Sequence, residues 1–484
     1  MRYILYKNIN LLSDSVVEAV NYISNNLNSV SLLSDCISAI SSIKTSFISN
    51  NIDTKELDLF LECVDQIIDC IDAKKEYALG INKLLEIAQS INEYCKKIEY
   101  KFKVVFFAEL GSKWDSMDSV YKAFKNRTDC EVTVVLAPIF RAIKLPNGEV
   151  KSDIIYEDYL TPMGISHIPF QKYDIKKELP DMAFTSQPYE SVTPEQFWTE
   201  NIVPYTKLVY LPYFTSRGVV DQNQIETQCK MPMQQLAWKV VCQSEKAKEI
   251  YSKYFPTKGK NIIATGLPKW DWVVNMKERD IVLPKEWEKL KGKKIILKNQ
   301  HYGFKPEKLL ELLRSSIDYF KNSDIGLLYR FHPMTETMFK VYYPNYKEEW
   351  EKVKKEIEVS SNVAIDYNTT YDAAFYYSDI LLTGITSIIS QYLLTKKPVV
   401  LINWGKLEKL KKYDESENAF LKITELYPAE SNENGYEICK KILKNDDYEY
   451  EKRMNLIKEW FPNAGSIGAK IADDLIEELK KEKI

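Results

Sequence analysis

Several sequence signals that would assign a function are missing from this chain of 484 residues. No two of its eight cysteines form a C-x-x-C pair, which argues against a zinc site or a disulfide framework and indicates buried free thiols. The chain has no G-x-G-x-x-G, Walker P-loop, H-E-x-x-H or G-x-S-x-G motif, so dinucleotide redox chemistry, NTP hydrolysis, zinc proteolysis and α/β-hydrolase chemistry lose support. It also has no D-x-D, the carboxylate pair with which many sugar-nucleotide transferases hold a divalent cation. We therefore expect no metal and no cofactor.

Charge and hydropathy exclude further classes of protein. Lys and Arg number 66 and Asp and Glu 69, so the chain has no overall positive charge with which to bind nucleic acid. The first residues contain no apolar core long enough for a signal peptide, and no apolar run approaches the ~18 residues of a transmembrane helix. We expect a cytoplasmic protein without a nucleic-acid partner, and peripheral association with the inner face of the plasma membrane stays open.

The character of the sequence changes near residue 101. Residues 1–100 carry apolar residues at helical spacing, which predicts a helical bundle or hairpin. Short apolar runs alternate with helical stretches over 101–275 and again over 276–445, and two helices close the chain over 446–484. This alternation predicts an α/β protein with two Rossmann-type domains, preceded by an all-helical N-terminal domain. The expected strands are 103–110, 130–138, 182–186, 207–213, 239–244, 293–300, 324–333, 363–368, 379–384 and 397–404.

The strand-to-helix junction within 379–402 offers a site for a phosphate. After an apolar strand, Thr383 and Gly384 make a tight turn, and Thr386 and Ser387 open an apolar helix. Backbone N–H groups, two hydroxyls and the positive end of a helix would meet at one place, which can cradle a phosphate without a metal. An ordinary helix N-cap at Thr386 or Ser387 explains the same residues.

Two histidines and an arginine follow predicted strands of the second half. Arg330 and His332 come after a buried strand that Pro333 ends, so both side chains are expected at the carboxyl edge of the sheet, where α/β proteins bind ligands. An arginine offers a fork for phosphate oxygens, and a histidine can donate a hydrogen bond or a proton. His301 also lies at a strand end, whereas His167 has no such context. A purely structural histidine is the alternative at each position.

These motifs together resemble one known family. The set comprises TGLPKWD (265–271), R-x-H-P (330–333), Asp372 with Asp379, TGITS (383–387), KP (397–398) and NAGS (463–466). In order and spacing it is similar to the CDP-glycerol:poly(glycerol phosphate) glycerophosphotransferase family, which includes teichoic acid polymerases and related capsule enzymes. Segments 112–116, 180–190 and 208–213 resemble one branch of that family. The resemblance covers about residues 103–475 and implies a GT-B-like fold, with an acceptor domain and a nucleotide-donor domain facing each other across a cleft.

The resemblance also implies roles for single residues. Arg330 and His332 fall on an element that contacts the donor phosphates, and Thr386 and Ser387 fall on the paired serines of the pyrophosphate turn T-D-x-S-S, which Thr383 and Gly384 begin. Further residues fall on positions expected to contact the rest of the donor or to take part in catalysis: Gly266, Pro268, Asp271, Gln391 and His301.

The chain departs from the family pattern at three places. Gly384 replaces the acidic residue of the turn, and Gln391 replaces a Glu that is common in the following helix. Residues 210–213 replace the W-H-G segment that carries the proposed general base of the polymerases, so no histidine can be assigned as the base. Glu109 and Asp115, in the first strand-to-helix loop, are the candidates that geometry offers instead.

The implied function is transfer of glycerol phosphate, or another alditol phosphate, from a CDP-activated donor to a hydroxyl of a cell-surface glycan precursor. The acceptor would be a lipid-linked or oligosaccharide precursor of teichoic acid or capsule. Two alternatives stay open. One is a GT-B glycosyltransferase with a CMP- or UDP-sugar donor, which would need nearly the same phosphate cradle. The other is a non-catalytic member that binds nucleotide or scaffolds a capsule complex.

Overall fold

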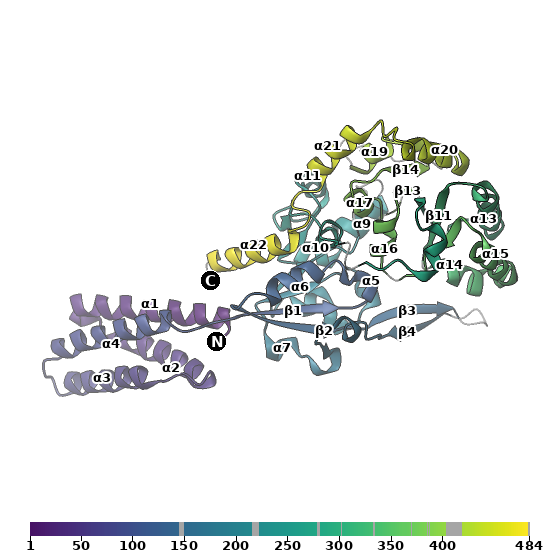
Figure 1. Cartoon of the computed structure of the whole chain (residues 1–484). Helices are drawn as coiled ribbons and strands as arrows, with labels where there is room; N and C mark the ends of the chain where they lie inside the picture. The colour runs from purple at the N-terminus through teal and green to yellow at the C-terminus, as the bar shows by residue number, and fades with distance from the viewer. Residues whose placement is uncertain are drawn as a thin grey trace.

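The computed structural model shows a helical domain joined to two α/β domains, each built on a parallel sheet (Figure 1). The helical domain projects to one side of the first α/β domain, and the second α/β domain lies above the first in this view. None of the helices in the part that the structure describes is long and apolar enough to cross a membrane. The described residues are 1–144, 150–214, 222–277, 281–301, 303–332, 334–368, 370–384, 386, 388–402 and 419–482.

Residues 1–100 form a bundle of four helices with a core of its own. The helices are α1 (Tyr3–Asn25), α2 (Leu33–Ser49), α3 (Lys55–Asp72) and α4 (Ala78–Lys96). Their apolar stripes face inward, as Leu57, Phe60, Val64 and Ile67 of α3 show, all of which are buried. The prediction of a helical N-terminal domain is confirmed.

A short junction ties both ends of the bundle to the first α/β domain. Tyr3 N–H donates to the Lys101 carbonyl at 3.0 Å. The buried carboxylate of Asp181 accepts from the N–H of Ile4 at 3.1 Å and from the N–H of Lys103 at 2.8 Å. One carboxylate therefore holds a residue from each end of the bundle, which fixes the bundle at two points.

The first α/β domain is built on a seven-stranded parallel sheet in the order β5-β2-β1-β6-β7-β8-β9. Its strands are β1 (Phe102–Ala108), β2 (Cys130–Leu136), β5 (Ile168–Pro169), β6 (Met182–Thr185), β7 (Lys207–Tyr210), β8 (Lys239–Val241) and β9 (Ile262–Ile263). Its helices are α5 (Gly111–Trp114), α6 (Asp118–Lys125), α7 (Ile175–Glu178), α8 (Thr199–Ile202), α9 (Gln222–Cys229), α10 (Pro232–Leu236) and α11 (Glu245–Tyr254). Each run predicted as a strand over 101–275 overlaps one of these strands, and the two-residue strands β5 and β9 were not predicted.

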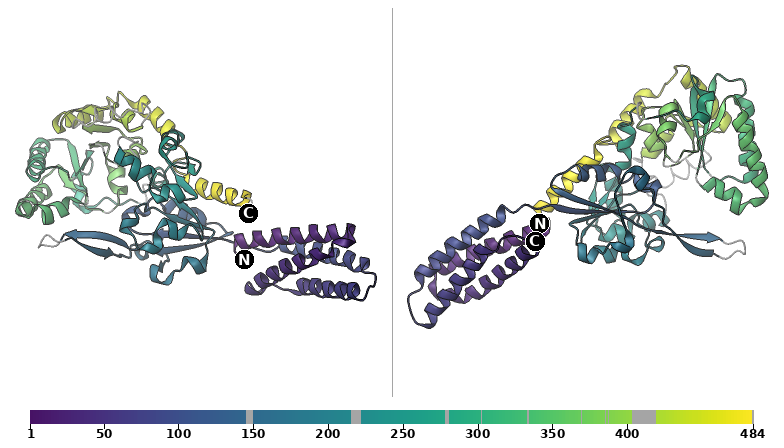
Figure 2. Two further views of the ribbon diagram at one scale, coloured as in Figure 1. Left: turned by 180° about the vertical axis from the view of Figure 1, so that it is seen from behind. Right: turned by 60° about the horizontal axis from the view of Figure 1, so that its bottom comes forward.

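The sequence analysis does not predict the antiparallel hairpin of β3 (Ile139–Lys144) and β4 (Val150–Ile155). Charged residues interrupt both strands, so they lack the continuous apolar run of a strand buried on two faces. The hairpin extends away from the first sheet on the side opposite to the bundle, as both views of Figure 2 show.

The second α/β domain repeats the pattern with six parallel strands in the order β12-β11-β10-β13-β14-β15. The strands are β10 (Lys294–Gln300), β11 (Ile325–Phe331), β12 (Val363–Ile365), β13 (Ile380–Thr383), β14 (Val399–Ile402) and β15 (Pro428–Ala429). The helices are α12 (Asp271–Val274), α13 (Pro306–Phe320), α14 (Met334–Thr337), α15 (Lys347–Val359), α16 (Asp372–Tyr377), α17 (Ile388–Leu393), α19 (Ala419–Thr424) and α20 (Asn432–Leu443). Two successive Rossmann-type domains are confirmed.

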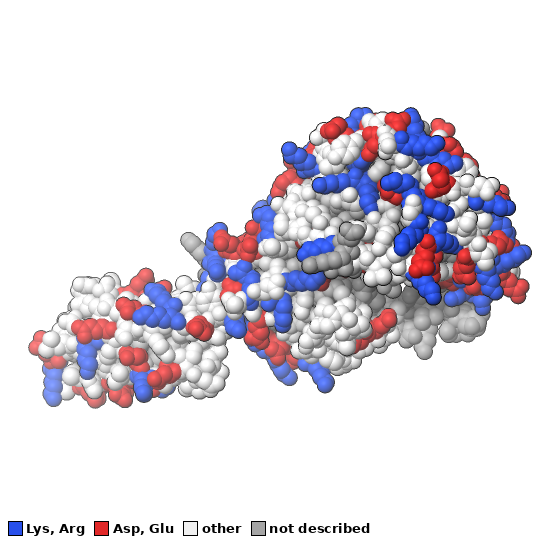
Figure 3. All heavy atoms as spheres, viewed as in Figure 1, with Lys and Arg blue, Asp and Glu red and all other residues white. Residues whose placement is uncertain are grey.

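The last two helices return the chain to the first domain. They are α21 (Tyr450–Trp460) and α22 (Ile467–Lys481), and Figure 2 shows them running from the second domain down to the first. Helix α22 packs on α6 so closely that a Cβ at Gly468 would lie 2.3 Å from the carbonyl carbon of Ser119. Only glycine fits there. Acidic and basic side chains interleave over the face shown in Figure 3.

Lys298 is an unusual core residue of the second domain. It lies on the central strand β10, is 1% exposed, and makes no hydrogen bond or ion pair to a described residue. Burial lowers the pKa of its ammonium to about 7, against which the nearby Cys439 and Glu433 act weakly. Below that pH the folded state must bury a cation, which lowers the free energy of unfolding. This destabilisation becomes smaller as the pH rises from 7 toward the ordinary pKa of 10.5.

We therefore expect Lys298→Met to stabilise the protein. Removing the buried amine should raise the melting temperature at pH 6 by at least about 4 °C, and the gain should shrink between pH 7 and 10. Lys294→Met is the matched control, because Lys294 lies on the same strand but is exposed and paired with Asp379 at 2.9 Å. A lower melting temperature for Lys298→Met at pH 6 would show that the amine has a stabilising partner.

Candidate active site

The predicted donor-side residues lie on three adjacent strands. Arg330 is the last residue but one of β11, His301 follows β10, and Thr383 ends β13, in a sheet where β10 lies between the other two. Because the strands are parallel, these residues meet at one carboxyl edge.

His301 and His332 face each other at this edge, with ring centroids 5.5 Å apart. His301 Nδ1 accepts from the N–H of Gly303 at 3.0 Å, and His332 Nδ1 accepts from the N–H of Met334 at 3.1 Å. Each neutral ring then carries its proton on Nε2. Burial, and secondly the charge of His301, lowers the pKa of His332. The structure therefore brings two predicted residues together at one edge of the sheet.

Arg330 binds neighbouring residues of its own domain through Nη1. Its guanidinium forms an ion pair with Asp366, donates to the Thr370 carbonyl at 2.8 Å, and stacks on the ring of Tyr371 at 3.9 Å. The Asp366 side chain has no exposed surface. Arg330 thus holds the loop between β12 and α16 in place, and Asp366 is the partner that sequence reasoning missed.

The Thr383–Thr386 turn is only partly defined. Thr383 is fully buried, and its hydroxyl lies 3.4 Å from the carbonyl of Asn299 and 3.4 Å from the hydroxyl of Thr386. Gly384 follows Thr383 at the end of β13, and the helix after the turn, α17, has six residues. Ser387 lies outside the described residues. The phosphate cradle stays a prediction.

Asp115 and Gln391 connect the two α/β domains. Gln391 Nε2 donates to Asp115 Oδ2 at 3.4 Å, and Lys269 Nζ lies 3.8 Å from the same oxygen. Lys269 also donates to the Tyr213 carbonyl at 2.8 Å. Gln391, which was expected at the donor, is 3% exposed and contacts Asp115 of the first α/β domain.

A polar cluster lies at the carboxyl edge of the first sheet. We call it the Glu109 cluster, and it consists of Glu109, Lys113, Tyr159, Thr185, Ser186 and Tyr210. Thr185 Oγ1 donates to Glu109 Oε1 at 2.9 Å, and Ser186 Oγ donates to Glu109 Oε2 at 3.1 Å. Glu109 is 4% exposed, and burial raises the pKa of its carboxyl while the charge of Lys113 and the two hydroxyls act against this.

The other members of the Glu109 cluster keep unused hydrogen-bonding capacity. The phenol oxygens of Tyr159 and Tyr210 are buried, and neither has a partner among the described residues. Lys113 is 9% exposed, and its Nζ lies 4.3 Å from the centroid of the Tyr213 ring. Burial lowers the pKa of Lys113, and the charge of Glu109 opposes this shift. Sequence reasoning found Glu109 but none of these three neighbours.

The segment with Gly266, Pro268 and Asp271 has a structural task rather than the expected donor contact. Both oxygens of the buried Asp271 carboxylate are taken by backbone N–H groups, those of Gly465 at 2.8 Å, Ile467 at 3.0 Å and Gly468 at 2.8 Å. Gly266 has φ +98°, and a Cβ there would lie 2.8 Å from the Pro462 carbonyl. Two motifs almost 200 residues apart therefore clasp the start of α22.

We expect Asp271→Ala to destabilise the protein. The change leaves three amide donors at the start of α22 without their acceptor, which should cost about 2–4 kcal/mol and lower the melting temperature. Asp473→Ala is the control on the same helix, because that carboxylate is 66% exposed. An unchanged melting temperature for Asp271→Ala would contradict the clasp.

A comparison with protein families identifies the chain. A model of the CDP-Glycerol:Poly(glycerophosphate) glycerophosphotransferase family matches residues 216–465. The chain belongs to this family. The family match begins well after the start of the predicted resemblance at residue 103, so the helical domain and much of the first α/β domain lie outside it.

One relative with a similar sequence supports the family assignment. The teichoic acid poly(ribitol-phosphate) polymerase of Bacillus spizizenii is 21% identical over 260 residues, which cover 51% of this chain and 38% of that protein. The chain thus spans well under two thirds of the length of this relative.

Solved structures agree on the fold at low identity. The family member is similar to Staphylococcus aureus MnaA with UDP (TM-score 0.51, 14% identity, 79% of this chain and 99% of that chain). It is also similar to the Neisseria meningitidis UDP-GlcNAc 2-epimerase bound to UDP-GlcNAc, with a TM-score of 0.52 and 13% identity over 78% of this chain and 100% of that chain. A variant of the wall teichoic acid polymerase TagF matches as well, with a TM-score of 0.50 and 14% identity over 87% of this chain and 98% of that chain. The predicted GT-B-like fold is confirmed.

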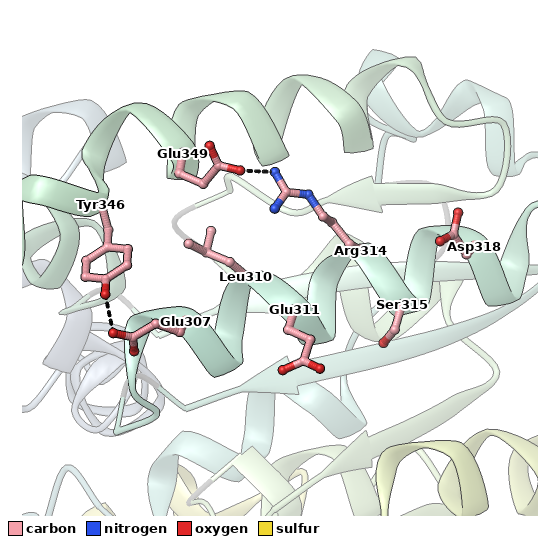
Figure 4. Close-up of a pocket in the computed structure, with 8 residues that line it drawn as sticks. All are labelled: Glu307, Leu310, Glu311, Arg314, Ser315, Asp318, Tyr346 and Glu349. Carbon is pink, nitrogen blue, oxygen red and sulfur yellow. Dashed lines mark hydrogen bonds and ion pairs between the residues drawn. The ribbon is translucent and has the colours of Figure 1, made fainter.

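A groove of about 490 Å³ lies away from these residues, between α13 and α15 on the outer side of the second domain (Figure 4). Arg314 pairs with Glu349 across it, and Tyr346 donates to Glu307 at one end. No predicted site residue lines this groove. Within the described ranges no group of three or more His, Cys, Asp or Glu side chains is arranged to hold a metal ion.

Proposed function

We propose that this family member transfers glycerol phosphate, or another alditol phosphate, from a CDP-activated donor to a hydroxyl of a cell-surface glycan precursor. The observation that carries the proposal is the His301–His332 pair beside the Thr383 turn, in a chain whose second half matches the family. Imidazoles with the proton on Nε2 can donate hydrogen bonds to the oxygens of a pyrophosphate.

The chemical step needs a base on the opposite domain. The acceptor hydroxyl oxygen forms a bond to the β-phosphorus, the bond from that phosphorus to the bridging oxygen breaks, and CMP leaves with the bonding electrons. The hydroxyl proton passes to the base. His301 and His332 would stabilise the charge on the phosphate oxygens, and the protein otherwise positions the two reactants.

Glu109 fits the role of base better than Asp115. Both oxygens of Glu109 are oriented by hydroxyl donors, and its pKa is raised, so it can take up a proton. Asp115 is paired with Lys269 and bonded to Gln391. Glu109 also lies near Tyr210, at the strand end where the polymerases carry their W-H-G segment.

The released nucleotide tests the proposal. Purified protein is incubated separately with CDP-glycerol, CDP-ribitol, a CMP-sugar and a UDP-sugar, and the free nucleotide is measured. We expect CMP from a CDP-alditol. Release of CMP or UDP from a sugar nucleotide alone would favour the glycosyltransferase, and nucleotide binding without release or transfer would indicate a non-catalytic member.

Catalysis is expected to need no divalent cation. The chain has no D-x-D, and the proposed donor contacts are imidazoles, hydroxyls and backbone N–H groups. Activity should therefore stay within about two-fold after treatment with EDTA, measured as nucleotide release before and after buffer exchange. A strict requirement for added Mg²⁺ or Mn²⁺ would contradict this expectation.

A further inference from the structure

The Glu109 cluster contains donors that the fold leaves unused. Tyr210 is 2% exposed, and its phenol oxygen has no hydrogen-bond partner in the described part of the chain. The phenol oxygen of Tyr159 is in the same situation, in a ring that packs against Gly111 at the start of α5. A buried hydroxyl without a partner costs free energy, so two of them beside one carboxylate indicate a place where a ligand supplies the missing acceptors.

The three unused donor groups come from separate elements and surround one carboxylate. Lys113 lies on α5, Tyr159 follows β4, and Tyr210 ends β7. Register places Tyr210 beside Thr185, whose hydroxyl donates to Glu109. Both phenols are close enough to Glu109 for its charge to raise their pKa.

Charge balance decides which kind of ligand fits. Lys113 faces Glu109, and Lys269 lies 3.8 Å from Asp115. Each of these cations has a carboxylate beside it, so the described residues of this edge carry no surplus positive charge for a phosphate. Hydroxyl and ammonium donors next to a carboxylate instead suit a neutral polyol, one oxygen of which donates to Glu109 while its neighbour accepts.

We propose that Lys113, Tyr159 and Tyr210 determine acceptor specificity by binding the second oxygen of an uncharged vicinal diol, whose first hydroxyl is bonded to Glu109. This inference rests on the proposed function and narrows its acceptor to a chain end with two adjacent hydroxyls. The attacking hydroxyl gives its proton to Glu109, and the neighbouring oxygen accepts from the lysine or a phenol and stays unchanged.

Three small alcohols test the inference with the full chain and CDP-glycerol. They are 1-O-octylglycerol, 3-octyloxy-1-propanol, which lacks the second hydroxyl, and an octylglycerol analogue that carries a phosphate in place of the second hydroxyl. We expect kcat/KM for octylglycerol to exceed both others by at least about 10-fold. Tyr159→Phe and Tyr210→Phe should each lower kcat/KM for octylglycerol by about 3- to 10-fold and leave kcat/KM for 3-octyloxy-1-propanol unchanged. Tyr156→Phe is the matched control, since Tyr156 is on the same loop and 40% exposed.

Stability and binding make the outcome decisive. Both variants remove only an unpaired oxygen, so neither should lower the melting temperature. A preference for the phosphate analogue, or an unchanged diol preference in both variants, would overturn the inference. Binding of the three alcohols, measured by calorimetry without donor, should rank them in the same order, and equal affinities would overturn it too. Absence of CMP release from CDP-glycerol in every sample would instead reject the proposed function, which the binding ranking does not depend on.

Discussion

Glu109→Gln is expected to lower turnover by about 10²- to 10⁴-fold, the usual contribution of a positioned general base. Glutamine keeps the size of the side chain and can accept a hydrogen bond from one of the two hydroxyls of Thr185 and Ser186 while its NH2 donates to the other, but it cannot take up a proton. The affinity for CDP-glycerol, measured by calorimetry, should stay within a few-fold because Glu109 lies in the other domain from the His301–His332 pair.

The pH profile gives an independent readout of the same group. Burial raises the pKa of Glu109 above its ordinary value of 4.5. A base must be ionised, so wild-type turnover should fall as the pH drops through this raised pKa, and Glu109→Gln should lack that fall. Asp115→Asn serves as the control and should lose at most a few-fold. A Glu109→Gln protein with a third or more of wild-type turnover would place the base elsewhere.

His332→Ala is expected to lower turnover by about 10- to 150-fold. Losing a hydrogen bond to a charged group costs ~1.5–3 kcal/mol, which converts to that range. His301→Ala should have an effect of similar size, and the double variant should lose less than the product of both, because the rings face one another and would act on the same phosphate.

The third histidine of the chain is the matched control for this series. His167 contacts the Ile165 carbonyl and lies 3.7 Å from Asp158 in the first domain, so His167→Ala should change turnover by less than two-fold. Melting temperature and turnover should be measured on the same preparations. A stable His332→Ala protein with full activity would remove the main support for the proposed donor site.

The longer strands of both sheets could be predicted because parallel strands covered on two faces read as continuous apolar runs, as in β1 and β13, whereas the two-residue strands β5, β9 and β15 are too short to give such a run. The β3–β4 hairpin could not, since charged residues interrupt the apolar run of both strands. The positions of His301 and His332 at strand ends could also be predicted, and the two rings lie close together in the structure.

Contacts between distant segments could not be predicted from spacing. Arg330 was expected at the sheet edge and lies there, but only the fold shows that Asp366 from the next strand occupies its guanidinium. The motif at 265–271 was assigned to the donor from the family resemblance, whereas Asp271 serves α22. A sequence motif indicates that certain residues work together. It does not indicate whether these residues bind a ligand or one another.

The two-point attachment of the helical bundle makes it a spacer of set length and direction. Helix α1 starts at the Asp181 junction and runs for 23 residues, about 35 Å at the usual rise per residue. The rings of Tyr3, Tyr100 and Phe102 contact one another in tilted and edge-on arrangements and stiffen the same junction. Any surface or molecule that holds the far end of the bundle will therefore keep the two α/β domains at a constant distance and angle from itself, so that only part of the surrounding volume is within reach of the active site.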